Sequence, residues 1–301
     1  DMAAAVERIR RAVANHEKIT VFCDYDADGT CGGSALYLHL RRAGADVTIQ
    51  TPNRHREGYG LSSAAVEQIA EDGGTLIITV DCGITNVAET ALAKSLGVDV
   101  IVTDHHECGE VLPDTPYIIN AKRPDSAYPY RYLAGCGVAF KLIHALSSLS
   151  EAMRYIDLIA IGTITDIVPL LGENRVIAHM GLKKLRNNAS AGVAALARAA
   201  GISLPEISSF GIGFGLGPRI NAAGRMDTAE TAIEILTAGK QGPALSQSVA
   251  QLCTLNERRR QEVCDILADA EKMIAEHGYQ TDPAILLADS RWNAGVIGIA
   301  A

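Results

Sequence analysis

Short apolar runs alternate with segments of helical periodicity along the first 120 residues of the chain. Val6, Ile9 and Val13 recur at helical spacing and predict a helix within residues 2–16. Five apolar, β-branched runs predict strands, at residues 18–23, 46–51, 75–80, 98–102 and 117–120. Strands that alternate with helices imply right-handed crossovers and a parallel sheet. The predicted fold class is therefore α/β, a parallel sheet with helices on both faces.

Beyond residue 120 the pattern becomes mainly helical. We expect one domain over residues 1–243, in which the part to about residue 180 carries the sheet and residues 181–243 are helical with a glycine-rich loop. Apolar positions predict a long connecting helix over 244–278, ending near Gly278 and closed by Asp282-Pro283. A strand at 284–288 would open a second α/β domain over residues 282–301.

Three of the predicted strands end in acidic residues. The first leads into an extended turn with Asp24, Asp26 and Asp28, the third ends at Asp81, and the fourth ends at Asp104-His105-His106. The carboxyl ends of parallel strands meet at one edge of a sheet, where ligands bind. On an extended segment the alternating Asp residues would share one side. Neighbouring carboxylates repel each other unless protons or a hard cation such as Mg²⁺ or Mn²⁺ neutralise them.

A plainer interpretation of the acidic turn is that Asp and Gly only shape the backbone there. A calcium loop is disfavoured because the expected bidentate Glu is missing. The convergence of three acidic strand ends favours a metal site. Asp166, among apolar neighbours, is a further ligand candidate because burying an unpaired carboxylate is costly, although a helix cap or a surface position is the simpler explanation.

The segment 211–226 (GIGFGLGPRINAAGRM) combines glycines with Arg219 and Arg225. Glycines allow backbone to approach a phosphate closely, and guanidinium groups clamp phosphate oxygens. The segment lacks the Lys-Ser or Lys-Thr of a Walker loop. A flexible surface loop with solvated arginines is the competing interpretation.

Composition narrows the function classes. The chain has 301 residues, is 48% hydrophobic and carries a formal charge of −8, which disfavours a purely electrostatic nucleic-acid binder. This net charge is compatible with an enzyme whose basic groups line one groove. Seven scattered Cys predict reduced thiols in a cytosolic protein. No apolar stretch approaches the roughly 20 residues of a membrane span. Starting without Met and ending in an apolar run is typical of an excised fragment.

Six motifs in order, DYDADG, VDCG, TDHHE, GTITDIVPL, GPRINAAGRM and WNAGVIGIA, resemble the DHH phosphoesterases over nearly the whole chain. EGYGL (57–61), residues 122–142 and LNERRR (255–260) are most similar to that family's single-strand-specific 5′→3′ DNA exonucleases. The resemblance implies one or two Mn²⁺ or Mg²⁺ ions. Their expected ligands are Asp26, Asp28, Asp81 (as the bridge), His105 and Asp166, with Asp24 in support.

The resemblance also assigns catalytic and substrate contacts. His106 would face the scissile phosphate, Asp104 would support the metal cluster, and Arg219 and Arg225 would bind a phosphate oxygen. Further substrate contacts are expected from Asn221, Tyr59, Arg258, Trp292 and Asn293. Asn293 stands where the family usually has His, which weakens or alters that contact. The implied product is a 5′-mononucleotide and the implied partners are single-stranded DNA, a single-strand-binding protein and a helicase, in DNA repair and recombination in the cytoplasm.

Two other functions remain open. A related phosphodiesterase could act on small substrates such as oligoribonucleotides, cyclic dinucleotides or pyrophosphate. A non-catalytic DNA-binding subunit with the same fold ranks lower, because such a subunit would be expected to have lost metal carboxylates, and all of them are present here.

Overall fold

A five-stranded parallel sheet forms the centre of the protein. The computed structural model describes residues 1–54 and 58–301. The strands are β1 (Lys18–Cys23), β2 (Asp46–Gln50), β3 (Gly74–Val80), β4 (Asp99–Thr103) and β5 (Ile118–Ile119), in the order β2-β1-β3-β4-β5. Val21 pairs with Ile49 of β2 and with Ile78 of β3. All five predicted strands are confirmed, although β5 is shorter than expected.

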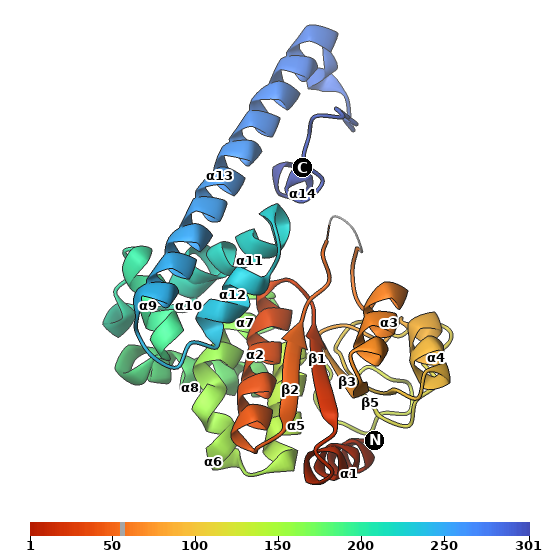
Figure 1. Cartoon of the computed structure of the whole chain (residues 1–301). Coiled ribbons are helices and arrows are strands. Elements are labelled where there is room, and N and C mark those ends of the chain that lie inside the picture. The colour runs from red at the N-terminus through yellow and green to blue at the C-terminus, as the bar shows by residue number, and fades with distance from the viewer. Residues whose placement is uncertain (55–57) are drawn as a thin grey trace.

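Helices cover both faces of the sheet (Figure 1). Side chains alternate along a strand, so Val21 and Phe22 of β1 enter different apolar layers. The first layer contains α1 (Met2–Ala14), α2 (Ala27–Arg42), α5 (Gly135–Leu146) and α7 (Ile156–Thr165). The second contains α3 (Ser63–Glu71) and α4 (Val87–Ser95). The predicted α/β class is confirmed.

A helical region follows the sheet. Its elements are α6 (Leu149–Ala152), η1 (Met153–Tyr155), α8 (Gly172–Asn188), α9 (Ala191–Ala199), η2 (Leu204–Glu206), α10 (Ser209–Gly211), η3 (Ile212–Leu216), α11 (Gly217–Met226) and α12 (Glu230–Leu236). Gly181 of α8 faces Ala160 of α7 so closely that a Cβ would overlap the alanine methyl group. The small pair lets these two helices pack tightly.

A 35-residue helix, α13 (Pro243–His277), projects from the body (Figure 1). It ends as predicted at Gly278, whose left-handed backbone (φ 74°) is typical of a helix C-cap. After η4 (Tyr279–Thr281) the chain turns back, and α14 (Ile297–Ala300) lies against α13. Trp292 and Val296 join Met226 and Ile266 in a small apolar cluster.

Three expectations about local structure are wrong. The acidic turn is not extended, because α2 begins at Ala27 and takes Asp28 into its first turn. The expected glycine-rich loop is helical, formed by α10, η3 and α11. Residues 284–288 form no strand: Leu286 is 96% exposed, and no described strand lies beside them to share backbone hydrogen bonds. In the described ranges, none of the helices has the length and apolar character to span a bilayer.

Candidate active site

The connection after β1 leads to β2 on one side, and the connection after β3 leads to β4 on the other side of the sheet. A topological switch point therefore lies between the neighbouring strands β1 and β3. The acidic residues that follow β1, β3 and β4 meet at this edge. Asp24 continues beside β3, with its N–H donating to the Val80 carbonyl at 3.1 Å. Asp26 caps α2 and accepts N–H bonds from Asp28 (2.8 Å) and Gly29 (3.0 Å). A side chain that caps a helix is fixed in position by the backbone it serves.

The carboxylate of Asp28 lies at the amino end of α5. It accepts the N–H groups of Gly135 at 2.6 Å and Cys136 at 3.0 Å. The positive end of the helix stabilises a negative charge there. Gly135 has to lack a side chain, because a Cβ would lie 2.5 Å from Oδ1 of Asp81. The start of α5 thus holds one carboxylate and makes room for a second.

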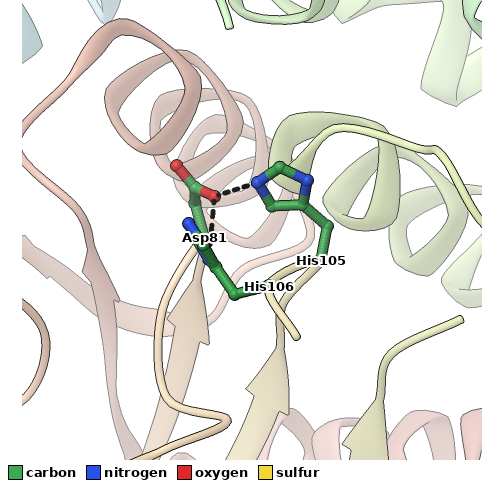
Figure 2. Close-up of side chains that lie close together, drawn as sticks. All are labelled: Asp81, His105 and His106. Atoms are coloured by element: carbon green, nitrogen blue, oxygen red, sulfur yellow. Dashed lines mark ion pairs between the residues drawn. The ribbon is translucent and has the colours of Figure 1, made fainter. Parts of the chain in front are cut away.

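Asp81 is the central acidic residue. It follows β3 with a left-handed backbone (φ 63°), a conformation that Asp tolerates better than most side chains, and its N–H donates to the Thr103 carbonyl at 3.0 Å. Figure 2 shows its Oδ1 facing both histidines, 3.1 Å from Nε2 of His105 and 3.9 Å from Nδ1 of His106. Asp166, at the end of α7, reaches within 3.7 Å of the same His105 nitrogen.

Asp104 orients the second histidine. It accepts backbone N–H bonds from His105 (2.7 Å), His106 (3.1 Å) and Ile84 (2.9 Å), and its Oδ1 lies 2.7 Å from Nδ1 of His106. Burial opposes ionisation, but these bonds, above all that of His106, lower the pKa of Asp104. The same bond raises the pKa of His106. The Tyr59 hydroxyl lies 3.0 Å from Nδ1 of His106 and donates to the Asp81 carbonyl at 2.9 Å.

Buried ligand atoms without a hydrogen-bond partner make this cluster a candidate cation site. They include Oδ1 of Asp24, Oδ1 of Asp81 and Nε2 of His105. Three sets of side chains have ligand atoms within 4.8 Å of one another: Asp24, Asp26 and Asp81; Asp28, His105 and Asp166; Asp81, His105 and His106. Carboxylates with few imidazoles suit a hard divalent ion such as Mg²⁺ or Mn²⁺.

The pKa values of the clustered carboxyl groups also indicate a cation site. Burial, followed by the charge of Asp26, raises the pKa of Asp24 to about 8. Burial and the charge of Asp28 raise the pKa of Asp166 to about 8 and the pKa of Asp81 well above its ordinary range. Crowded carboxylates retain protons when no cation is bound. A divalent cation would replace those protons and relieve the repulsion.

A cavity of about 220 Å³ opens beside this cluster. Its lining includes Asp24, Asp81 and His106 of the acidic cluster and also Arg54, Asn221 and Arg225. Asn221 of α11 accepts the Ala27 N–H at 2.7 Å, which ties α11 to the start of α2. The Arg54 guanidinium lies 5.2 Å from the centre of the Tyr25 ring. Burial and then the nearby Arg54 charge lower the pKa of Arg225. The cavity can hold an anion against a metal cluster.

The structure brings together most of the side chains expected from the sequence, and four lie elsewhere. Arg219 turns back to donate to the Gly215 carbonyl at 2.7 Å and does not line the cavity. Arg258 is exposed and pairs with Glu262 at 3.2 Å. Trp292 and Asn293 pack against α11 and α13. In the EGYGL segment, Glu57 lies outside the described residues, as does Arg56 before it.

Arg54 was not expected from the sequence, and within LNERRR the expected contact was Arg258 rather than Arg259. Arg54 precedes EGYGL and lines the cavity, and Arg259 of α13 lies within electrostatic reach of Arg219 and Arg225. A signal for Arg259 exists in the sequence. Arg259 lies seven residues after Leu252 and four residues before Val263, spacings that place it on the apolar face of the helix.

Comparison with known proteins agrees with this geometry. Residues 18–163 match the model of the DHH family, N-terminal domain. The chain is 42% identical over its whole length to the single-stranded-DNA-specific exonuclease RecJ of Bacillus subtilis (strain 168), and 37% identical to RecJ of Thermus thermophilus. It spans 38% and 43% of the lengths of these relatives.

Two solved structures are also similar. A crystal structure of exonuclease RecJ bound to manganese is 37% identical with a TM-score of 0.86, and the match covers all of this chain and 76% of that one. The Thermus thermophilus RecJ in complex with Mg²⁺ has a TM-score of 0.74 at 31% identity; the match covers the whole of this chain and 40% of that protein.

Proposed function

The chain belongs to the RecJ group of the DHH family, and on that premise we propose that it is the catalytic part of a metal-dependent exonuclease for single-stranded DNA. The observation that carries the proposal is that Asp24, Asp81 and His105 have buried ligand atoms without a hydrogen bond, beside a cavity that arginines also line. A phosphodiester hydrolase needs both a cation cluster and cationic groups that hold the phosphate.

We assign the cation cluster to Mn²⁺ or Mg²⁺, in one or two ions. The ligands are Asp24, Asp26, Asp28, Asp81, His105 and Asp166, which supply the carboxylate and imidazole atoms of the close sets described above. Solved RecJ structures hold Mn²⁺ or Mg²⁺, which supports this choice. When bound, such an ion activates water for attack on phosphorus and offsets the charge of the phosphoryl oxygens.

The residues of the chain supply the remaining parts of the mechanism. Arg225 and Arg54 would hold the phosphate oxygens and stabilise the charge that develops on them. Asn221 has its amide oxygen occupied by Ala27, so its NH₂ group remains to donate to the substrate. His106 has Nδ1 occupied by Asp104, so Nε2 is its remaining group for a hydrogen bond to the phosphate. Asp104 acts through His106.

The finer features rest on similarity to the relatives. We propose cleavage from the 5′ end to mononucleotides, and action with a single-strand-binding protein and a helicase in DNA repair and recombination. Seven free cysteines support a reducing, cytoplasmic setting. The boundaries at 243, 278 and 282, and substrate contacts by Tyr59, Arg219, Arg258, Trp292 and Asn293, also stay predictions.

The test is the release of nucleotides from 5′-labelled and 3′-labelled single-stranded DNA with Mn²⁺ or with EDTA, beside an Asp81→Ala control. Metal-dependent release from the 5′ end that the substitution abolishes is the expected result. Cleavage of dinucleotides with long strands intact would instead identify a small-substrate phosphodiesterase. Binding of long strands without any cleavage, in a protein with full metal occupancy, would identify a binding subunit.

A further inference from the structure

Two phenylalanines are stacked on the surface of the helical region. The rings of Phe210 and Phe214 have centres 4.6 Å apart and planes inclined by 27°, and the residues are 69% and 73% exposed. Exposing two neighbouring rings to water is unfavourable, because each has a large apolar surface. An exposed pair of this kind is typical of a surface that binds an apolar group.

The stacked pair lies on the same helical face as two residues of the cavity lining. The elements α10, η3 and α11 follow one another without a break over residues 209–226. At spacings of three and four, five positions of this run are at least partly exposed: 210, 214, 218, 221 and 225. The opposite face is buried, with Ile212 and Leu216 in the core. One stripe therefore connects the exposed rings to Asn221 and Arg225.

The helical run also packs beside the proposed metal site. Gly217 approaches the last turn of α7 so closely that a Cβ there would lie 2.4 Å from Oγ1 of Thr165. Asp166, a proposed metal ligand, directly follows Thr165. The segment η3 is π-helical, an irregularity that occurs frequently at functional sites. A strand that reaches the metal cluster past α11 would therefore pass close to the stacked rings.

We propose that Phe210 and Phe214 form a base-stacking platform, which binds nucleobases of the strand whose phosphate lies in the cavity. This inference rests on the proposed function, and it assigns a site outside the cavity. Every nucleobase has a flat π-face, so aromatic side chains bind bases with little dependence on sequence. Phe214 precedes Asn221 by seven residues, roughly 10 Å along the helix axis, so the stacked base belongs to a different nucleotide from the one being cleaved.

Binding without turnover tests the platform. The complete protein with Asp81→Asn serves as the background, a labelled single-stranded oligonucleotide as the probe, and Kd is measured over a range of salt. Phe214→Leu keeps an apolar side chain but removes the ring, and should weaken binding about tenfold, the size of one stacking contact. The salt dependence of Kd should stay unchanged, because no phosphate contact is lost. Phe214→Tyr retains a ring and should keep Kd within about twofold of the background value.

An abasic nucleotide then locates the stacked base. At one position near the 5′ end it should weaken binding by the background protein as much as Phe214→Leu does. It should cause no further loss in the Phe214→Leu protein, because the ring and the base form one contact. Leu96→Ala is the control, at an exposed apolar residue shortly before β4 begins, at the end of the sheet opposite the metal cluster. This control should change Kd less than about twofold.

Equal Kd for the Phe214→Leu and Leu96→Ala proteins would overturn the platform in favour of a protein surface as the occupant of the rings, and would leave the nuclease proposal intact. An equal loss in Phe214→Leu on intact strands and on every abasic strand would also overturn it, because no base would then be the partner of the ring. A protein without Asp81→Asn that neither binds strands nor releases nucleotides with Mn²⁺ would count against both proposals. Thermal unfolding verifies that each variant is folded, with melting temperatures within about 2 °C of one another.

Discussion

The acidic side of the site, formed by the Asp and His cluster, and its basic side, formed by the arginines, are built in different ways. On the acidic side, Asp26, Asp28 and Asp104 each accept at least two backbone N–H groups, at strand ends or helix starts. On the basic side, the arginines extend from helices and one loop, and Arg225 donates from Nη1 to the Gly295 carbonyl at 3.0 Å. Backbone anchoring fixes positions to the tolerance that metal ligation requires. Long arginine side chains on helices can adjust their positions to a flexible nucleic-acid strand.

The largest effect on activity should come from substituting Asp81, the central residue of the acidic side. Asp81→Asn removes the charge that lies nearest His105, and should lower kcat/KM for single-stranded DNA by about 10³-fold or more. At alkaline pH, where the crowded carboxyls lose their protons, the same change removes a buried like charge and should raise the melting temperature of the metal-free protein. Nucleotide release and thermal unfolding measure the two. A lower melting temperature together with full activity would contradict the ligand assignment.

The basic side should respond less strongly. Arg225→Gln should lower kcat/KM by about 10²-fold, because a donor to the developing phosphate charge is lost. Metal affinity should stay within about threefold of the parent value, since Arg225 contributes no ligand atom. Steady-state kinetics and Mn²⁺ titration separate the two effects. An equal loss of Mn²⁺ affinity would mean that the two sides do not act independently.

The pH dependence of stability sharpens the contrast. Free carboxyls titrate near pH 4, whereas the pKa values of Asp24 and Asp166 are raised to about 8 in the folded, metal-free protein. The folded state thus binds more protons between these values, so its stability should fall as pH rises from about 4 to 8. Saturating Mn²⁺ at pH 8 should raise the melting temperature by at least about 5 °C. A metal-free melting temperature that stays level across this range would refute the crowded-carboxylate account.

The smallest effect should come from the support of Arg225. Asn293 donates to Glu262 at 2.8 Å and accepts the Gly295 N–H at 2.8 Å, which shapes the turn whose carbonyl holds Arg225. Asn293→Ala should raise KM about threefold with kcat nearly unchanged, as expected for a lost hydrogen bond. Arg291→Gln, at an exposed neighbour, is the control. A large fall in kcat would indicate direct contact with the substrate instead.

Sequence patterns predicted the sheet well and the local backbone less well. Runs such as residues 75–80 are apolar and β-branched, so their strands and the convergence of their acidic ends follow from topology. The early start of α2 was missed because Asp26 was interpreted as part of an extended turn, although Asp is among the preferred N-cap residues. Residues 284–288 carry strand propensity, but the described chain offers them no strand to pair with.

The basic side was the harder part to predict. Arg258, Arg259 and Arg260 are indistinguishable by composition, and only the phase of α13 separates them. The positions of Leu252 and Val263 show which residues of α13 lie on its apolar face. Which helix packs against that face depends on the tertiary fold. Arg54 stands alone before a turn, with no pattern around it that connects it to α11. Contacts between distant segments therefore had to come from the structure.

The spread of the acidic side chains along the chain, from Asp24 to Asp166, has a consequence for biosynthesis. A polypeptide is made from its amino end, and Asp24, Asp81 and His105 are completed well before Asp166 arrives. A partly synthesised or truncated product that ends before α7 carries several ligands without the last one. A nuclease of the proposed kind would thus lack part of its metal site until α7 has been synthesised.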